Sequence, residues 1–212
     1  MRRFLHIGVD DTDSPRGGCT TYIAALLIER LSLLGLEFVD YPNLVRLNPN
    51  VPWKTRGNGA VCLRITGKPE MLDEAREITI EAVDEEADLE CLGTDPGIVF
   101  YEGRVIPQEF RRFAKETTQD VVTYSRALSL IKKFGAEIFA FKDGRGIIGA
   151  LAAVGEVLRG DHTYELITYR ARQNFGTPRR VDAESVLRMD ERSRGVTFNN
   201  VCLLYTSDAA DE

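Results

Sequence analysis

Carboxylates, glycines and threonines crowd the stretch IGVDDTDSPRGGCTTYI near the start of the chain. Asp10, Asp11 and Asp13 follow an apolar run, and carboxylate oxygens gathered at the end of a strand suit Mg²⁺. The residues that can direct backbone N–H groups and a helix N-terminus at phosphate oxygens are Gly17, Gly18, Thr20 and Thr21. Nucleotide-dependent phosphoryl transfer requires a metal beside a bound phosphate, because its catalysis is mainly positioning and charge neutralisation. The plainer interpretation is a turn capped by Asp11 or Asp13.

A second polar segment, RLNPNVPWKTRGNGA, predicts a phosphate-binding loop. Lys54 and Arg56 are its cations, and Gly57 and Asn58 follow them directly. Glycines let a backbone approach a ligand closely, and two cations can clamp phosphate oxygens. An ordinary polar turn with solvated charges is the alternative.

Three further motifs are open to both structural and functional interpretations. LGTDPGIVF places Thr94 and Asp95 before a Pro-Gly pair, which turn chemistry explains equally well. FKDGRGIIGALAAVG joins a predicted strand to a helix of small residues, a composition that suits close packing. GDHTYELITYR contains His162, and a single histidine of this kind is more often a surface or capping residue than a general base.

Alternating elements must position these motifs. Periodicity in the first half predicts, in order, a strand at 3–9, a helix at 20–34, an extended stretch at 38–47, a strand at 60–65, a helix at 70–86 and a strand at 97–101. This β-α-β-β-α-β order is typical of an α+β sandwich, with helices on one side of a mostly antiparallel sheet.

A second unit is expected to begin after EGRVIP. Its predicted elements are a helix from about 108, a helix at 124–133, a strand at 137–141, a helix after KDGRG, a strand at 162–169 and a helix at 183–192. No linker rich in Pro, Gly or Ser separates the two halves, so we expect them to pack tightly and share a cleft.

Charge divides unevenly between the halves. Residues 1–103 carry 10 basic and 18 acidic residues, a net charge of −8, whereas residues 104–201 carry 17 and 12, a net charge of +5. The second half can therefore face a polyanion. No apolar run approaches the ~20 residues that span a bilayer, and the four cysteines form no C-x-x-C pair. We expect a cytoplasmic protein with reduced thiols, no disulfide framework and no zinc site.

The last eleven residues, CLLYTSDAADE, match an in-frame translation of a transposase adapter used in short-read sequencing. We interpret residues 202–212 as an artefact, which interrupts the natural reading frame at about Val201. An ordinary acidic tail is the alternative.

The five motifs quoted above, in their order along the chain, resemble the archaeal TiaS family, the 2-agmatinylcytidine synthetases of the AUA-reading isoleucine tRNA. The resemblance covers nearly all of residues 3–201. It implies an ATP-binding, kinase-like domain over residues 1–103 and a ferredoxin-like domain, truncated, over residues 104–201. The OB-fold and zinc ribbon of the family are absent from this sequence, so we expect the chain to bind ATP but to modify tRNA poorly.

The resemblance also implies the chemistry. ATP is cleaved at both phosphoanhydride bonds, the 2-carbonyl oxygen of the wobble cytidine is phosphorylated, and agmatine then displaces phosphate at that carbon. The implied roles are Mg²⁺ binding and phosphate polarisation by Asp10, Asp11 and Asp13, autophosphorylation of Thr20, and ATP phosphate binding by Gly17, Gly18, Thr21, Lys54, Arg56, Gly57 and Asn58. The partners are the tRNA, ATP and agmatine, with no DNA and no membrane.

Agmatine is a dication at neutral pH, so its pocket should present carboxylates. Asp143, Asp161 and Glu165 are the candidates.

Two other classes of function remain open at this point. Asp11-x-Asp13 after a strand is similar to the nucleophile motif of haloacid dehalogenase phosphatases, although Pro15 stands where those enzymes have Thr or Val. A non-catalytic module that binds nucleotide or RNA would use the acidic cluster only as a metal-dependent element of the fold.

Overall fold

The computed structural model describes residues 2–55, 57–158, 162 and 182–192. The chain forms two compact units, Met1–Val157 and Leu158–Glu212. In the second unit, helix α6 (Ala183–Arg192) matches the helix expected there. The strand expected at 162–169 lies outside the described residues apart from His162. Residues 202–212, interpreted as an adapter translation, also lie outside them.

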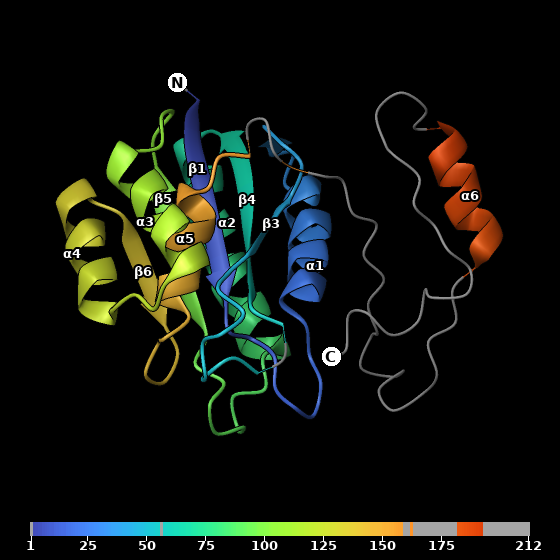
Figure 1. The fold of residues 1–212 in the computed structure, drawn as a ribbon. Helices are drawn as coiled ribbons and strands as arrows, with labels where there is room; N and C mark the ends of the chain where they lie inside the picture. The colour runs from blue at the N-terminus through green and yellow to red at the C-terminus, as the bar shows by residue number, and fades with distance from the viewer. Residues whose placement is uncertain (1, 56, 159–161, 163–181, 193–212) are drawn as a thin grey trace. The chain divides into compact units, whose positions relative to one another are not determined.

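The first unit is built on a six-stranded sheet in the order β2-β4-β1-β5-β6, with β3 also paired to β4 (Figure 1). The strands are β1 (Arg3–Asp10), β2 (Glu37–Phe38), β3 (Asn43–Arg46), β4 (Gly59–Gly67), β5 (Gly97–Glu102) and β6 (Glu137–Ala140). All pairings are antiparallel. Strand β1 is central, and its end at Asp10 pairs with Gly97, the first residue of β5.

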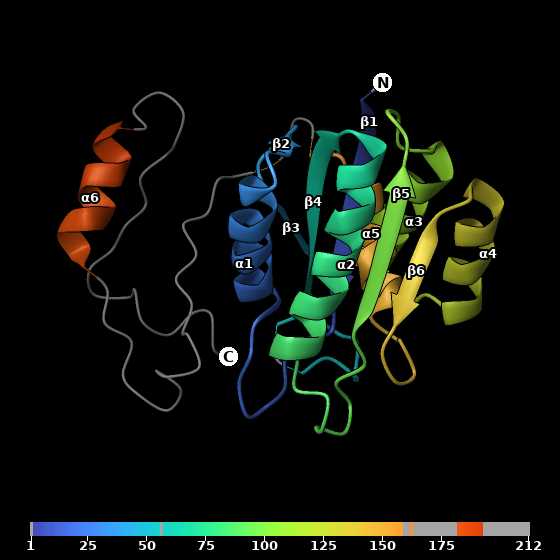
Figure 2. The same ribbon diagram turned by 180° about the vertical axis from the view of Figure 1, so that it is seen from behind.

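Helices cover both faces of this sheet. They are α1 (Thr20–Leu33), α2 (Pro69–Glu86), α3 (Gln108–Gln119), α4 (Tyr124–Phe134) and α5 (Ile147–Gly155). Helices α1 and α2 pack on one face (Figure 2), and α3, α4 and α5 lie on the other (Figure 1). The α+β class is confirmed, and the two helices of the first half, α1 and α2, lie on one side of the sheet as expected. The helices on the other side come from the segment that was expected to form a second unit. Among the described helices, none is long and apolar enough to cross a membrane.

The division between compact units also differs from the expected boundary after residue 103. Strand β6 extends the sheet beyond β5, and α3 and α5 bury the face that α1 and α2 leave open. The physical reason is visible in β1, where every residue from Leu5 to Val9 is buried. The neighbouring strands place Ala60, Cys62 and Val99 on the face opposite Ile7 and Val9, and residues 104–157 supply the layer that covers them.

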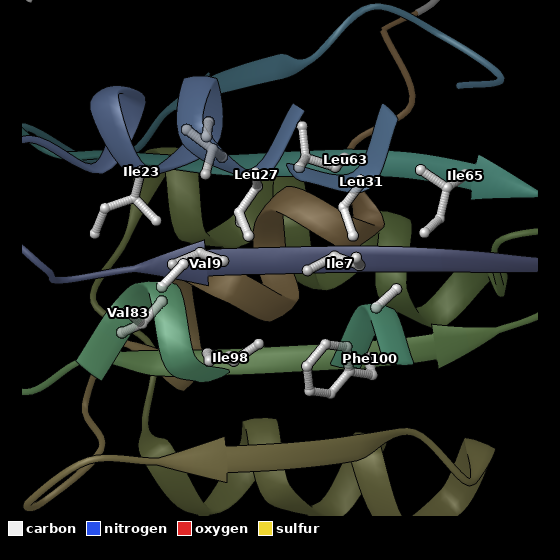
Figure 3. Packing of buried hydrophobic residues seen from close by; sticks show 14 of the residues in the cluster. Ile7, Val9, Ile23, Leu27, Leu31, Leu63, Ile65, Val83, Ile98 and Phe100 are labelled. Carbon is white, nitrogen blue, oxygen red and sulfur yellow. The ribbon is translucent and has the colours of Figure 1, made fainter. Parts of the chain in front are cut away.

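Two apolar layers result. On one face, Ile7 and Val9 of β1 pack with side chains of the covering helices; Figure 3 shows Ile23, Leu27 and Leu31 from α1 and Val83 from α2. On the other face, the largest fully buried side chains include Phe110 and Phe113 of α3. Both layers hold the end of β1 in place.

Helix α5 approaches the sheet unusually closely because glycines face it. A Cβ added at Gly8 would lie 2.1 Å from the carbonyl oxygen of Ala150, and one at Gly97 would lie 2.1 Å from the backbone nitrogen of Ile147. At Gly146 an added Cβ would lie 2.6 Å from the carbonyl oxygen of Asp10. The first turn of α5 is therefore pressed against the point where β1 ends and β5 begins.

A buried arginine holds the opposite end of α5. Arg64 of β4 donates from Nη2 to the carbonyl oxygen of Glu156 at 2.5 Å and from Nε to Asn43 Oδ1 at 3.1 Å. Its Nη1 lies 2.8 Å from Nδ1 of His6, whose Nε2 lies 2.7 Å from the carbonyl oxygen of Gly103. Because a guanidinium only donates, Nδ1 must accept and His6 must be neutral. A cation at a helix C-terminus also opposes the helix dipole.

Replacing Gly8 with Ala should destabilise the first unit, because the added methyl group overlaps the backbone of α5. We expect a loss of about 1–3 kcal/mol in the free energy of unfolding, measured by urea denaturation. Gly57→Ala is the matched control, since at Gly57 an added Cβ would meet nothing closer than 3.9 Å. Equal losses in the two variants would contradict the close approach of α5.

The His6 contact should make stability depend on pH. Burial lowers the pKa of His6 from 6.5 to about 4. Between these values the unfolded chain binds the proton and the folded chain does not, so His6 lowers stability as pH falls from 6.5 towards 4. From pH 7 to pH 5, urea unfolding of the wild-type chain should lose about 2 kcal/mol more than His6→Gln does.

The control for this comparison is His162→Gln, which removes the chain's other, exposed histidine. It should keep the wild-type dependence on pH. Identical pH dependence of wild type and His6→Gln would show that His6 is protonated in the folded protein.

Candidate functional site

The adjacent residues Asp10 and Asp11 line a cavity of about 350 Å³ at the end of β1. Asp10 is the last residue of the strand, and Asp11 adopts a positive φ of 60°, which is uncommon outside glycine. Burial, reinforced by the neighbouring Asp11 carboxylate, raises the pKa of Asp10 to about 8. Asp10 lies directly against α5, since a Cβ added at Gly149 would lie 1.9 Å from Asp10 Oδ2. Two neighbouring carboxyl groups in such a place must be compensated either by protons or by a cation.

Arg145, two residues before α5 begins, contacts the carboxylate of Asp11. Arg145 Nη2 lies 2.7 Å from Asp11 Oδ2, and its Nη1 lies 3.5 Å from Asp95 Oδ2. Arg145 also donates to the carbonyl oxygen of Gly93. Asp95 is buried, and its backbone N–H donates to Asp11 Oδ2 at 3.3 Å. Burial raises the pKa of Asp11, although the Arg145 ion pair opposes that shift.

The second polar segment lines the same cavity through Lys54 and Asn58. Its loop is held by Asn48, whose backbone N–H donates to the carbonyl oxygen of Thr117 at 3.1 Å. Asn58 Nδ2 in turn donates to the carbonyl oxygen of Asn48 at 2.7 Å. These bonds tie the loop to the end of α3, and so place Lys54 in one cavity with Asp10 and Asp11, as the motifs predict.

The rest of the cavity wall is mainly apolar or aromatic. Trp53, the only tryptophan in the chain, is 54% exposed. The remaining lining residues are Leu47, Val51, Thr117, Asp120, Val121, Val122, Thr123, Tyr124, Gly146 and Ile148. An apolar wall with a few convergent polar groups is typical of a small-molecule site, and this volume is in the usual range.

The glycine-rich turn lies beside this cavity rather than in its lining. Gly17 and Gly18 have positive φ values of 154° and 85°, and Ser14 and Gly17 form a pair of backbone hydrogen bonds. Thr20 is buried at the start of α1, where its Oγ1 lies 2.9 Å from Thr12 Oγ1. Thr21 Oγ1 contacts Cys19 Sγ. None of these hydroxyls lines the cavity.

The structure therefore does not bring every expected site residue together. Asp13, Gly57 and Asp143 do not line the cavity, and Asp143 is exposed. The backbone carbonyl of Asp13 accepts from the hydroxyls of Thr94, at 2.9 Å, and Thr55, at 3.4 Å, which fixes its place in the turn. The expected residues outside the described part of the chain are Arg56, Asp161 and Glu165.

Arg145, Gly149 and Trp53 are the site residues that sequence reasoning missed. The GRG triplet at residues 144–146 was a usable signal, because glycines on both sides of a cation often mark close approach to a ligand. Nothing local in the sequence marks Gly149. Its importance comes from packing against Asp10 at the end of β1, which is a tertiary contact.

The carboxylates at this site suit Mg²⁺ only when the ion is also bound by substrate phosphates and waters. Among the described residues, no three His, Cys, Asp or Glu side chains are grouped so that they could hold a metal, so a cage of Asp10, Asp11 and Asp13 is not preformed. Asp10 and Asp11 alone suit Mg²⁺, because this ion is usually bound by one or two carboxylates together with substrate phosphates and waters.

Comparisons with known proteins point to one family. Residues 6–143 match the TiaS TCKD domain, and residues 144–206 match the TiaS FLD domain. The chain is 51% identical over 197 residues to TiaS of Pyrococcus horikoshii, a 2-agmatinylcytidine synthetase of an isoleucine tRNA, and 42% identical over 201 residues to that of Methanocaldococcus jannaschii. The alignments cover 93% and 92% of this chain, but only 46% and 47% of those relatives.

Solved structures give the same result. A complex of TiaS with its isoleucine tRNA and ATP matches with a TM-score of 0.79 at 42% identity, covering 94% of this chain and 47% of that one. A complex of TiaS with the tRNA, AMPCPP and agmatine matches with a TM-score of 0.77 at 39% identity, with the same coverage. The chain thus spans about half the length of the relatives it matches. Over that half, sequence and fold agree, and the chain belongs to the TiaS family.

Proposed function

We propose that this chain carries the ATP-dependent catalytic site of a tRNA 2-agmatinylcytidine synthetase, a ligase that modifies the wobble cytidine of the AUA-reading isoleucine tRNA. One observation carries the proposal: the cavity gathers Asp10, Asp11, Lys54 and Arg145 where the TCKD match ends and the FLD match begins. The kinase-like and ferredoxin-like descriptions of the two domains rest on the same matches. The tRNA substrate supports a cytoplasmic location as part of this proposal.

The proposed reaction has two stages. ATP is first cleaved at both phosphoanhydride bonds: one phosphoryl group passes to the 2-carbonyl oxygen of the cytidine, the other passes to water as phosphate, and AMP is released. The primary amine of agmatine then forms a bond to that carbon and loses a proton, while phosphate leaves with the oxygen. Support comes from relatives whose solved complexes contain the isoleucine tRNA with ATP, and the same tRNA with AMPCPP and agmatine.

The residues of this chain supply binding, orientation and exclusion of water. Lys54 and Arg145, which both line the cavity, offer positive charge to phosphate oxygens, while Trp53 offers an aromatic face to a base. The apolar wall lowers the local dielectric, which strengthens every charge interaction inside. Asp10 and Asp11 would hold Mg²⁺, which neutralises charge on the phosphate chain when bound.

Thr20 remains the proposed autophosphorylation site. Its hydroxyl is buried against Thr12, so phosphorylation requires it to leave that hydrogen bond and reach the nucleotide. Agmatine binding by Asp143, Asp161 and Glu165 is likewise a proposal. Asp143 is exposed, as a group that receives a second substrate must be before that substrate binds.

Incubating the chain with γ-labelled ATP and Mg²⁺ tests the proposal. We expect label on Thr20 as a phosphothreonine, and we expect Asp11→Asn to lower labelling at least about 100-fold, because it removes a carboxylate from the phosphate site. Thermal unfolding and calorimetric ATP titration of the variant show whether its fold and nucleotide site remain.

Three results would contradict this function. An acyl phosphate on Asp11, identified by mass spectrometry, would indicate a phosphatase of the haloacid dehalogenase type. Unchanged labelling in Asp11→Asn would remove the acidic pair from the mechanism. Nucleotide binding without any turnover in the wild-type chain would indicate a binding module.

Gly149→Ala should test whether the position of Asp10, rather than the packing of α5 in general, determines the affinity for MgATP. The new methyl group would overlap Asp10 Oδ2 and must displace the carboxylate, so calorimetric affinity for MgATP should fall about 10-fold to 100-fold. Gly8→Ala is the matched control, because it also pushes on α5 but contacts Ala150 and Val154 instead of Asp10. Equal affinity for MgATP in these two variants would argue against a role of Gly149 in positioning Asp10.

A further inference from the structure

One side chain in this cavity has two incompatible partners. Asp11 is ion-paired with Arg145 at 2.7 Å, and the proposed function assigns the same carboxylate to a divalent cation. The carboxylate of Asp95 lies 3.5 Å from the same guanidinium and gives Arg145 a second anionic neighbour. A carboxylate oxygen cannot give its full charge to two cations at once, so binding one weakens binding of the other.

We propose that Arg145 occupies the divalent-cation position in the nucleotide-free protein and transfers from Asp11 to the phosphate chain when the cation binds. This inference rests on the proposed function and deepens it by naming a residue that couples metal binding to nucleotide binding. Arg145 suits the exchange because its planar guanidinium matches both carboxylate and phosphate geometry. The released guanidinium stays in the cavity that Lys54 also lines, where the phosphates are expected.

The surroundings of Arg145 permit the side chain to move while the backbone stays fixed. The N–H of Gly146 donates to the carbonyl oxygen of Asp95 at 2.9 Å, and α5 is held against the sheet by its glycine contacts. The Arg145 side chain itself is 30% exposed. A long side chain on a fixed backbone can redirect its end group without disturbing the helix.

The loop that Arg145 contacts has a second support. Lys142 Nζ donates to the carbonyl oxygens of Cys91 and Thr94, each at 2.7 Å. The hydroxyl of Thr94 also donates to the carbonyl oxygen of Asp13. The loop carrying Asp95 therefore stays attached when Arg145 leaves Gly93. The exchange does not require the site to unfold.

Calorimetry on the 212-residue chain tests the exchange, with Mg²⁺ alone and MgATP as separate ligands. In Arg145→Gln, we expect Mg²⁺ affinity without nucleotide to rise at least about fivefold, because the competing cation is gone. MgATP affinity should fall at least about fivefold, because a phosphate partner is gone. A merely structural role for Arg145 would weaken both ligands together.

Two comparison variants support the measurement. Arg126→Gln removes an arginine that is paired with Glu116 on the surface, and it should change neither affinity. Arg145→Lys keeps the charge, so Mg²⁺ affinity should remain near that of the wild type. The fluorescence of Trp53, at the cavity, provides an independent binding signal.

The outcomes separate the two proposals. Opposite changes in the two affinities support the exchange. Parallel changes, or none, in Arg145→Gln overturn it while leaving the proposed function in place. A wild-type chain that binds neither Mg²⁺ nor MgATP overturns the proposed function, and the exchange with it.

Discussion

The structure depends on the close contact between the first turn of α5 and the end of β1. Glycines make it possible, since side chains at Gly8, Gly97 or Gly146 would force the helix away from the sheet. The contact places Arg145 over Asp11 and brings Gly149 against Asp10. If α5 moved outward by the width of a methyl group, Asp11 would lose its ion pair with Arg145 and Asp10 would lose its contact with Gly149. The site is thus a consequence of how tightly two elements pack.

Electrostatics adds a second constraint on the same contact. Asp10 and Asp11 are adjacent and largely buried, and burial raises the pKa of both. A buried pair of carboxylates is costly unless cations or protons compensate it. Arg145 supplies part of that compensation in the free protein. The remaining demand supports the proposed divalent cation and polyphosphate, which would bring positive charge to the carboxylates and negative charge to Lys54.

One cavity is lined by four separate segments: the end of β1, the loop after β3, the junction of α3 with α4 and the start of α5. These segments span residues 10–149, and the FLD match begins at residue 144. A division of the chain by its sequence matches therefore does not divide its chemistry. The second layer of helices brings residues 145–149 to residues 10 and 11, because β1 is buried on both faces and needs cover on each.

Much of this protein could be read from the sequence. Periodicity located α1 and β5 within a residue or so, and the types and spacing of Asp10, Asp11 and Lys54 indicated a phosphate site, because local chemistry is written in local sequence. The two-faced sheet and the partnership of Arg145 with Asp11 came only from the tertiary structure. Arg145 and Asp11 are 134 positions apart in the sequence. No local pattern predicts which glycine will pack against which helix. The sequence determined which chemical groups the chain contains, and packing determined which of those groups share a cavity.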